Sequence, residues 1–370
     1  MWTFALLVVV AVPLLAHLAS VALALSRPGL PTRSTGVPFR PFMSLLRPVK
    51  GLDPFDRETL ASSFALDYPD YEVIFCAAAG DDPACAEIRS MIAANPGVKA
   101  RLLVGDTRLT NNPKLNNLSK GVAAARADWL VMADANLMLP PDYLAGLADS
   151  WRPDTGLVSG PPLGYRAGNF WGAVECAFLN TSQARWQLAA DALGLGYAQG
   201  KTMLWSRRVL DAGGGIVALG RDLAEDVGAT KLVRGQGLRV CLPHRLSAQP
   251  VGTRTMRAVW DRQLRWSRVR RDGFPGLFVA EILQGPVPGL SILLGLGAAD
   301  ALTPWLAAAF VAVWYGAELT FARALGLDLR PRDAAAMIAR DLAQPLVWAA
   351  TFARRGFDWR GTEMAAVCAK

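Results

Sequence analysis

Apolar residues concentrate at the two ends of the chain, and apolar and polar positions alternate in short runs between them. The stretch from Trp2 to Ser26 contains no formally charged residue and is long enough to cross a bilayer as a helix. A cleaved signal peptide would begin with a positive segment and carry a shorter apolar core. The pattern therefore predicts an uncleaved N-terminal transmembrane anchor over residues 1–26.

Basic residues follow the predicted anchor and set its expected orientation. They are Arg27, Arg33, Arg40, Arg47 and Lys50. Lys and Arg accumulate on the cytoplasmic side of membrane segments. We therefore expect the N-terminus outside and the main domain in the cytoplasm, which makes the chain an integral membrane protein.

A second apolar region begins near Phe278. Its first two runs, 286–299 and 302–322, are separated by Asp300 and Pro304, a break that suits a tight turn. The two runs predict a transmembrane or re-entrant hairpin.

A third apolar run, 334–352, is interrupted by residues that are costly in lipid: Arg340, Asp341 and Pro345. Three interpretations stay open: the run lies in the membrane interface, turns back, or spans the bilayer with its charges paired. We expect a C-terminal membrane region over 275–355, followed by a cytoplasmic tail over 356–370.

Between residues 40 and 272, short apolar runs typical of buried strands alternate with helical patterns. The predicted strands are 43–46, 71–79, 99–104, 128–136 and 156–160, and the predicted helices are 59–66, 81–95, 116–127 and 141–151. Alternating strands and helices predict an α/β domain with a mostly parallel, doubly wound sheet. Ligands bind beyond the carboxyl ends of such strands, so polar residues directly after strands are the candidates for function.

Composition supports a membrane-associated protein, since 52% of the residues are apolar and only 19% are charged. The net charge of +8 is compatible with nucleic acid, acidic lipid or a phosphorylated substrate, and alone it does not separate them. The five cysteines are scattered without CxxC spacing, which argues against a disulfide framework or a zinc site and suits a reducing compartment.

The chain has only two histidines, His17 and His244. A metal cluster built from histidines is therefore excluded, and a Ser-His-Asp triad would have to use His244. Carboxylates become the leading candidates for acid–base chemistry. Two predicted strands run into acidic residues, one at Asp81-Asp82 and the other at Asp134-Ala135-Asn136.

The simplest interpretation of these acids is a helix cap or a turn, and for Asp82 alone it is the stronger one. For Asp134 it is weaker, because a strand that ends in D-x-D or D-x-N is a known way to hold a divalent ion against a diphosphate. Magnesium prefers one or two carboxylates together with phosphate oxygens. A second acidic pair, Glu225-Asp226, lies in a helical pattern and fits a solvated surface equally well.

The segment DRQLRWSRVRRD, residues 261–272, packs five arginines around one tryptophan just before the C-terminal apolar region. Arginine presents a planar fork that matches phosphate oxygens. In a helix Arg262, Arg265 and Trp266 share one face, whereas Arg268, Arg270 and Arg271 extend towards the membrane and its lipid head groups. A nucleic-acid partner is not expected, because this basic cluster runs straight into the apolar tail.

The order of these motifs resembles the membrane-bound GT-A glycosyltransferases, and most closely the ceramide glucosyltransferases of family 21. The motifs are LRPVKGLDP (46–54), DDP (81–83), NPKLNNL (112–118), MADAN (132–136), AED (224–226) and RQLRW (262–266). The resemblance covers about residues 40–275 and implies a cytoplasmic GT-A catalytic domain over 40–272. It further implies an inverting transferase that uses a UDP-sugar and a lipid acceptor.

For the donor, the resemblance assigns roles to single residues. Asp82, with Asp81 beside it, matches an aspartate expected near the uridine, and Asp134 matches the ligand of a divalent cation, Mg²⁺ or Mn²⁺. The remaining donor-binding positions lie in the NPKLNNL loop and the RQLRW segment: Lys114, Asn116, Asn117, Arg262, Arg265 and Trp266. The last three would close on the diphosphate, where positive charge stabilises the departing UDP.

The central motif departs from a full DxD, because Asn136 stands where a second acid is usual. One carboxylate supplies less negative charge to a hard cation than two do. We therefore expect a divalent ion to bind Asp134 weakly alone and clearly only with the nucleotide.

For the acceptor, Asp226 matches the catalytic base of the family, with Glu225 as the local competitor. At TSQARW (181–186) animal ceramide enzymes carry a histidine where this chain has Gln183. Gln183, Trp186 and Trp171 are candidates for an acceptor path, and ordinary core packing explains the aromatic residues about as well.

The leading functional hypothesis is transfer of glucose from UDP-glucose to the primary hydroxyl of ceramide, at the inner membrane of a bacterium. Alternatives change the donor to UDP-galactose or UDP-N-acetylglucosamine, or the acceptor to a hopanoid or diacylglycerol. A processive polysaccharide synthase is disfavoured by the short tail. A non-catalytic lipid-binding scaffold is disfavoured because Asp134, Asp226, Arg265 and Trp266 are all present.

Overall fold

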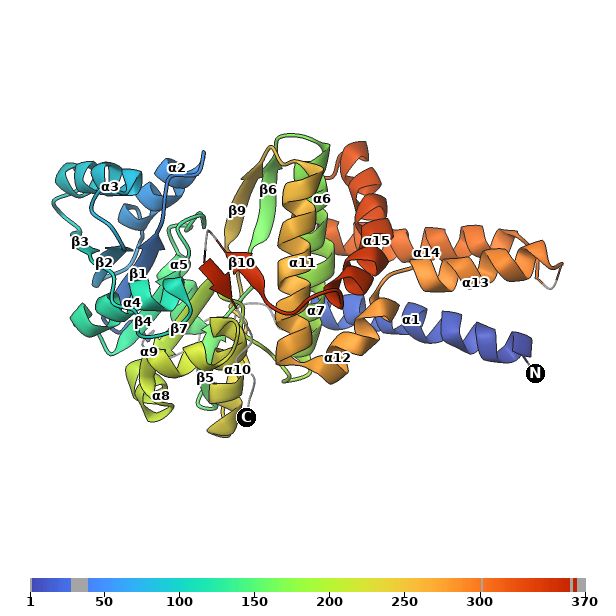
Figure 1. Ribbon diagram of the computed structural model, residues 1–370, viewed down its shortest axis with the longest axis horizontal. Helices are drawn as coiled ribbons and strands as arrows, with labels where there is room; N and C mark the ends of the chain where they lie inside the picture. Colours follow the sequence, from blue (N-terminus) through green and yellow to red (C-terminus); the bar gives the residue numbers. More distant parts are fainter. Residues whose placement is uncertain (1, 28–38, 301, 360–361, 365–370) are drawn as a thin grey trace. The chain divides into compact units, whose positions relative to one another are not determined.

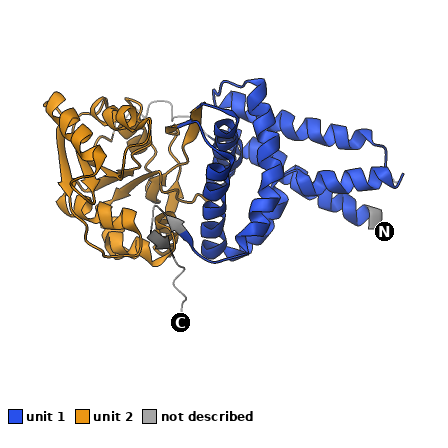
Figure 2. Cartoon of the chain, turned by 45° about the horizontal axis from the view of Figure 1, so that its top comes forward, with its two compact units in different colours: residues 1–27, 167–192, 251–357 blue, residues 28–166, 193–250, 358–370 orange. Residues whose placement is uncertain are grey.

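The computed structural model describes residues 2–27, 39–300, 302–359 and 362–364, which form two compact units (Figures 1 and 2). The helical unit comprises residues 1–27, 167–192 and 251–357, and the sheet unit comprises 28–166, 193–250 and 358–370. Residues 167–192 and 251–272, which we expected within the catalytic domain, thus group with the helices of the chain's two ends. Arg33 and most of the predicted tail over 356–370 lie outside the described residues.

The sheet unit contains a seven-stranded sheet in the order β3-β2-β1-β4-β7-β5-β8. Its strands are β1 Met43–Val49, β2 Tyr71–Ala77, β3 Lys99–Val104, β4 Trp129–Ala133, β5 Thr155–Ser159, β7 Thr202–Ser206 and β8 Arg239–Cys241. Strands β1 to β4 run parallel to one another, as predicted. Strand β7 was not predicted, and it lies antiparallel between β4 and β5. The α/β fold class is confirmed, and the sheet is mostly parallel as predicted, with β7 as its antiparallel strand.

Helices cover both faces of this sheet, which explains the nearly continuous apolar runs in its strands. Successive residues of a strand point to opposite faces, so Leu45 and Leu46 of β1 belong to two different core clusters. One cluster includes residues of α2 Asp56–Ala61, α3 Pro83–Ala94 and α5 Tyr143–Asp149; the other includes residues of α4 Pro113–Ala124, α8 Arg207–Ala212 and α10 Glu225–Gly235.

Two of these helices begin at residues from the sequence motifs. Asp82 caps α3 by accepting a hydrogen bond from Ala84 N at 2.9 Å, and Asn112 caps α4 by accepting one from Lys114 N at 2.9 Å. A proline occupies the first position of each helix, where its missing N–H costs nothing. The cap interpretation of Asp82 is therefore confirmed.

The helical unit contains helices from both ends of the chain, together with α6, the π-helix, α7 and α11 from the middle of the chain. They are α1 Trp2–Leu25, α6 Phe170–Ala177, a π-helix Phe178–Ala184, α7 Arg185–Ala192, α11 Met256–Gly273, α12 Pro275–Ala280, α13 Val287–Ala298, α14 Trp305–Ala324 and α15 Pro331–Thr351. Helices α1 and α14 are long and apolar enough to cross a membrane. The α12–α13 region adds a third candidate if its two segments, bent by 46°, form one span.

The third apolar run forms one helix, α15, and its charges are paired. Arg340 donates to both carboxylate oxygens of Glu318 at 2.9 Å and lies 2.8 Å from Asp341 Oδ1, and all three side chains are almost fully buried. Tyr315 Oη donates to Asp341 Oδ2 at 2.9 Å. Of the interpretations left open by the sequence, paired charges are therefore what the structure contains.

Short elements complete the chain. They are the 3-10 turns Ser62–Phe64, Leu219–Arg221 and Glu281–Gln284, α9 Gly215–Ala218, and the strands β6 Leu163–Ala167, β9 Ala248–Gly252, β10 Phe357–Trp359 and β11 Thr362–Met364. Strands β6 and β9 pair with each other, as do β10 and β11.

A fully buried arginine holds the loop that follows β4. Arg47 Nη2 donates to the carbonyl oxygens of Ala135 at 2.9 Å, Thr59 at 3.1 Å and Leu137 at 3.2 Å. Burial lowers the pKa of Arg47 to about 10, so the guanidinium stays charged at neutral pH. This arginine therefore fixes the backbone on both sides of Asn136, directly beyond Asp134.

Replacing Arg47 by Met should remove its hydrogen bonds to three buried carbonyl groups, of which Ala135 O keeps Thr59 Oγ1 and Thr59 O keeps Ser62 Oγ as donors. We expect the sheet unit to lose roughly 1–3 kcal/mol of unfolding free energy. Urea unfolding of the detergent-solubilised protein measures this. Arg57→Met is the matched control, because Arg57 is 69% exposed and pairs only across the surface with Glu87. Equal stability of the Arg47 variant and this control would contradict the assignment.

Candidate active site

A cluster of charged side chains in the sheet unit lies where β4 ends and β7 begins. Because the two strands are antiparallel, Ala133 at the end of β4 pairs with Thr202 at the start of β7. The next residues outward, Asp134 and Lys201, are therefore neighbours, and Asp134 N donates to Lys201 O at 3.1 Å. The strand pairing alone brings the Asp134 carboxylate of one segment beside the Lys201 side chain of another.

Asp134 lies between two lysine ammonium groups. Its Oδ1 is 2.6 Å from Lys114 Nζ and its Oδ2 is 2.9 Å from Lys201 Nζ. The lysine side chains are only 9% and 12% exposed, respectively. Burial alone would raise the pKa of Asp134, but the two ammonium groups lower it well below its usual range. We call this group the Lys114–Asp134–Lys201 cluster.

Glu225 extends the cluster and is not a solvated surface residue. Its Oε1 lies 2.8 Å from Lys114 Nζ, and its Oε2 accepts from Asn112 Nδ2 at 2.8 Å. Gly200 lies beside it, and a Cβ there would displace the Glu225 carboxylate and lie 3.3 Å from Lys114 Nζ. Burial alone would lower the pKa of Lys114, but Asp134 and Glu225 together raise it.

Asp226 occupies the first turn of α10 and differs from its neighbour in its partners. Its Oδ1 accepts from Val227 N at 2.9 Å and its Oδ2 from Gly200 N at 3.2 Å. Burial, with the charge of Glu225, raises the pKa of Asp226 to about 6, although the two backbone donors and Lys114 act against the rise. A carboxylate with a pKa near the working pH suits general base catalysis, which favours Asp226 over Glu225 as the base.

The residues around Asp134 do not fit a metal site preformed by the protein. Both carboxylate oxygens already face lysine ammonium groups, and Asn136 Oδ1 accepts from Lys201 Nζ at 3.0 Å. Over the described ranges of the chain, no three His, Cys, Asp or Glu side chains form a group that could hold an ion. The oxygen atoms of the D-x-N motif are thus bound to an ammonium group.

The other donor-side residues of the sheet unit hold its loops. Asn116 and Asn117 are buried: Asn116 Oδ1 accepts from Thr110 N at 2.8 Å, and Asn117 Nδ2 donates to Cys76 O at 2.6 Å. Asp82 Oδ2 accepts from Gly51 N at 2.8 Å in addition to capping α3, whereas Asp81 beside it is exposed. These side chains shape the edge of the sheet through backbone contacts.

The remaining predicted residues belong to the helical unit, on the π-helix and on α6, α7 and α11. As predicted, Arg262 and Trp266 share one face of α11, with the guanidinium 4.5 Å from the centre of the indole ring. Arg262 Nε lies 3.0 Å from the buried Glu175 carboxylate. Arg265 is partly buried on the same helix.

The three acceptor candidates have separate surroundings within the helical unit. Gln183 Nε2 donates a long hydrogen bond of 3.4 Å to Gln263 Oε1. The Trp186 ring lies 4.9 Å from the Arg185 guanidinium, and the Trp171 ring packs edge-on against Phe170. Gln183 thus contacts Gln263 of the RQLRW segment.

The later arginines of α11, which we expected at lipid head groups, have partners within the helical unit that the sequence did not predict. Arg271 donates to the carbonyl oxygens of Thr351 and Arg354 at the end of α15, and Arg270 pairs with Glu281 at 2.8 Å. Arg268 is buried, 3.4 Å from Gly356 O. A helix leaves its last carbonyl groups without partners, so α15 offers acceptors that the sequence pattern does not reveal.

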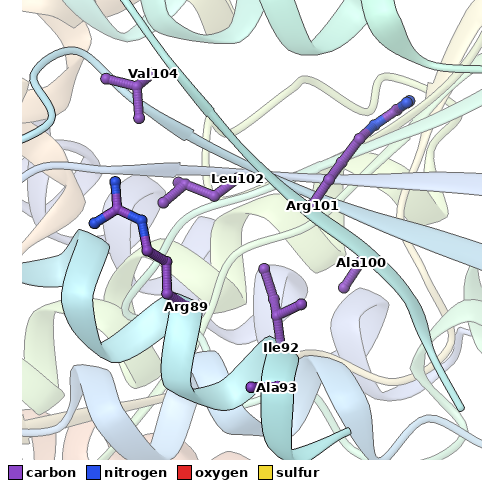
Figure 3. Close-up of a pocket in the computed structure, with 7 residues that line it drawn as sticks. All are labelled: Arg89, Ile92, Ala93, Ala100, Arg101, Leu102 and Val104. Atoms are coloured by element: carbon purple, nitrogen blue, oxygen red, sulfur yellow. The ribbon is translucent and has the colours of Figure 1, made fainter. Parts of the chain in front are cut away.

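A hollow in the surface of the sheet unit lies elsewhere, between α3 and β3 (Figure 3). None of the predicted site residues lines it. The guanidinium groups of Arg89 and Arg101 point away from each other there, so they do not form a joint anion site (Figure 3).

Sequence reasoning missed Lys201. The available signal was a lysine directly before the apolar run TMLW, which is strand β7. The strand itself was not predicted, so nothing connected this lysine with Asp134.

Residues 3–369 match glycosyl transferase family 21. Ceramide glucosyltransferase 1 of Caenorhabditis elegans is 29% identical over 263 residues, which are 70% of this chain and 56% of that protein. The ceramide glucosyltransferase of Komagataella phaffii is 36% identical over 112 residues, 29% of this chain and 22% of that protein. The chain thus spans about half the length, or less, of these curated relatives.

A solved structure shares the fold. It is a mannosyltransferase from Pyrobaculum calidifontis in complex with GDP-mannose and Mn²⁺, with a TM-score of 0.56 and 18% identity. The similarity covers 92% of this chain and 97% of that one. At this identity the match supports the GT-A-type fold and nothing about ligands.

The raised pKa of Asp226 predicts a pH-dependent stability difference. Above about pH 6 the Asp226 carboxylate is ionised in the folded protein, where burial disfavours the charge, and this lowers the unfolding free energy. Below the ordinary carboxyl pKa the group is protonated in both the folded and the unfolded state, and the effect disappears. Asp226→Asn should therefore raise the unfolding free energy at pH 8 by roughly 1–3 kcal/mol and lose that advantage towards pH 4. Urea unfolding at the two pH values tests this.

The control for this experiment is Asp70→Asn, because Asp70 is 55% exposed and pairs with Lys99 on the surface. A stabilisation of the Asp226 variant that is the same at both pH values would show that the carboxylate does not titrate as argued.

Proposed function

The chain belongs to glycosyl transferase family 21, and from this premise we propose that it transfers glucose from UDP-glucose to the primary hydroxyl of ceramide. The single observation that carries the proposal is the position of Asp226 in the first turn of α10, directly beside Glu225, which pairs with Lys114 as Lys114 in turn pairs with Asp134. The curated relatives named ceramide glucosyltransferase support the choice of donor and acceptor.

In the proposed reaction Asp226 removes the proton of the acceptor hydroxyl while its oxygen attacks the anomeric carbon of the sugar. The bond from that carbon to the diphosphate breaks on the opposite face, so the configuration inverts and UDP leaves with the electron pair. Negative charge grows on the departing diphosphate, and cationic groups fixed near it lower the barrier. Arg265 is the guanidinium that the family resemblance assigns to this task.

The resemblance also implies Mg²⁺ or Mn²⁺. Because the residues around Asp134 do not fit a site made by the protein alone, no step of the reaction is assigned to the ion.

The acceptor is proposed to be a lipid drawn from the membrane, with the sheet unit on the cytoplasmic side. Helices α1 and α14 support the membrane location. Because Gln183 stands where animal ceramide enzymes carry a histidine, a hopanoid or diacylglycerol is the alternative acceptor. UDP-galactose and UDP-N-acetylglucosamine are the alternative donors.

The direct test of the function incubates the purified protein with UDP-glucose, UDP-galactose or UDP-N-acetylglucosamine and with ceramide, diacylglycerol or a hopanoid. The mass of the lipid product identifies both substrates at once. We expect hexosylceramide from UDP-glucose. Product with another pair would keep the transferase and change its substrates, whereas no product with any pair would refute the proposal.

Asp226→Asn should abolish transfer, by at least about 100-fold in kcat, while UDP binding persists. The base acts on the acceptor and contributes little to holding the nucleotide. Product formation and UDP calorimetry are to be measured on the same preparation. Loss of both together would show that Asp226 binds the donor instead.

Arg265→Lys should lower kcat/KM by roughly 10-fold or more although the charge is kept, because an ammonium group does not reproduce a bidentate fork. Arg257→Lys is the matched control on the same helix, since Arg257 is 91% exposed. Unchanged kinetics in the Arg265 variant would remove this residue from the diphosphate site.

A further inference from the structure

Lys201 binds the same two side chains that would hold a divalent ion in a strand-end D-x-N motif. Its ammonium lies 2.9 Å from Asp134 Oδ2 and 3.0 Å from Asn136 Oδ1. The side chain is 12% exposed, so the contact is enclosed and not a surface ion pair. An ammonium group therefore stands at the oxygens of this motif.

The charges account for the departure from D-x-D. Two carboxylates and one divalent cation sum to zero, and so do one carboxylate, one neutral amide and one ammonium. Asp134, Asn136 and Lys201 form the second combination, and the other ammonium on Asp134, that of Lys114, is balanced separately by Glu225. The asparagine and the lysine are thus matched: a second acid would leave an unbalanced negative charge, and a divalent ion would meet the ammonium.

We propose that the Lys201 ammonium is the built-in cation of this motif and that it contacts the diphosphate of the donor in place of a divalent ion. The inference rests on the proposed function for the identity of the donor as a nucleoside diphosphate sugar. Lys114, on the other oxygen of Asp134, holds the carboxylate in position from the opposite side. Nucleotide binding by this chain is then independent of divalent ions.

Two features of the fold support this role. The antiparallel start of β7 fixes the backbone of Lys201 against Asp134 through the hydrogen bond from Asp134 N to Lys201 O. Arg47 fixes the other half of the motif by binding the carbonyl oxygens of Ala135 and Leu137. The ammonium and its two oxygen partners are therefore preorganised before any ligand binds, as a charge-stabilising site requires.

The test is calorimetric titration of UDP, and separately of uridine, into the full chain in detergent, once with excess chelator and once with Mn²⁺. For the unaltered protein, the dissociation constants of UDP measured with chelator and with Mn²⁺ should differ by no more than about threefold. Lys201→Met should weaken UDP binding in chelator by roughly 10- to 100-fold, as expected for loss of a charge-assisted hydrogen bond, and leave uridine binding unchanged. Lys99→Met, on an exposed pair with Asp70, is the control.

Lys201→Gln repeats the experiment with a polar neutral side chain in case the Met variant does not fold, with the same expected loss. The double variant Asn136→Asp, Lys201→Met restores the charge balance of a divalent site. It should bind Mn²⁺ directly, which electron paramagnetic resonance detects. Its affinity for UDP should return only when Mn²⁺ is present.

UDP binding by the unaltered protein that is lost in chelator and restored by Mn²⁺ would overturn the proposal. So would a Lys201 variant that binds UDP as tightly as the unaltered protein, or one that loses uridine equally, which indicates a merely structural role. The readout needs no acceptor. If no lipid yields product but UDP binding keeps its dependence on Lys201, the proposed function fails and this inference stands.

Discussion

The pairing of Asp134 with Lys201 depends on one constraint, the antiparallel insertion of β7 next to β4. In a wholly parallel sheet the residue before β7 would lie at the opposite edge, far from the carboxyl end of β4. Reversing this single strand brings Lys201 to the edge where ligands bind. Lys114, from the start of α4, and Glu225, from the start of α10, complete the group because both helices begin at the same edge.

A second constraint recurs in both units: charges removed from water are paired. Arg47 Nη2 donates to carbonyl groups of the loop that follows Asp134, and Arg340 pairs with Glu318 and Asp341. A buried charge without a partner costs several kcal/mol, so these residues restrict the conformations that their surroundings adopt. In the sheet unit this restriction fixes the active-site loop, and in the helical unit it joins α14 to α15.

The arginines of α11 illustrate how tertiary contacts assign similar residues to different tasks. Arg262 faces a buried glutamate and a tryptophan ring, whereas Arg271 binds carbonyl groups at the end of α15. Helical spacing predicts which residues share a face, and it did so correctly for Arg262 and Trp266. It does not tell what lies opposite that face, so the partners of the later arginines within the helical unit were not predicted.

The sequence alone determined the local elements: the N-terminal apolar helix, β1 to β5, the helices between them and the family motifs. These depend on apolar periodicity, helix caps such as Asp82 and short-range spacing, all of which are visible in consecutive residues. Only the tertiary structure decided the direction of β7, the lysine partners of Asp134 and the internal contacts of Arg268 to Arg271. Each joins segments far apart in the chain, as Lys201 and Asp134 are, and no local pattern encodes which distant segments pack together.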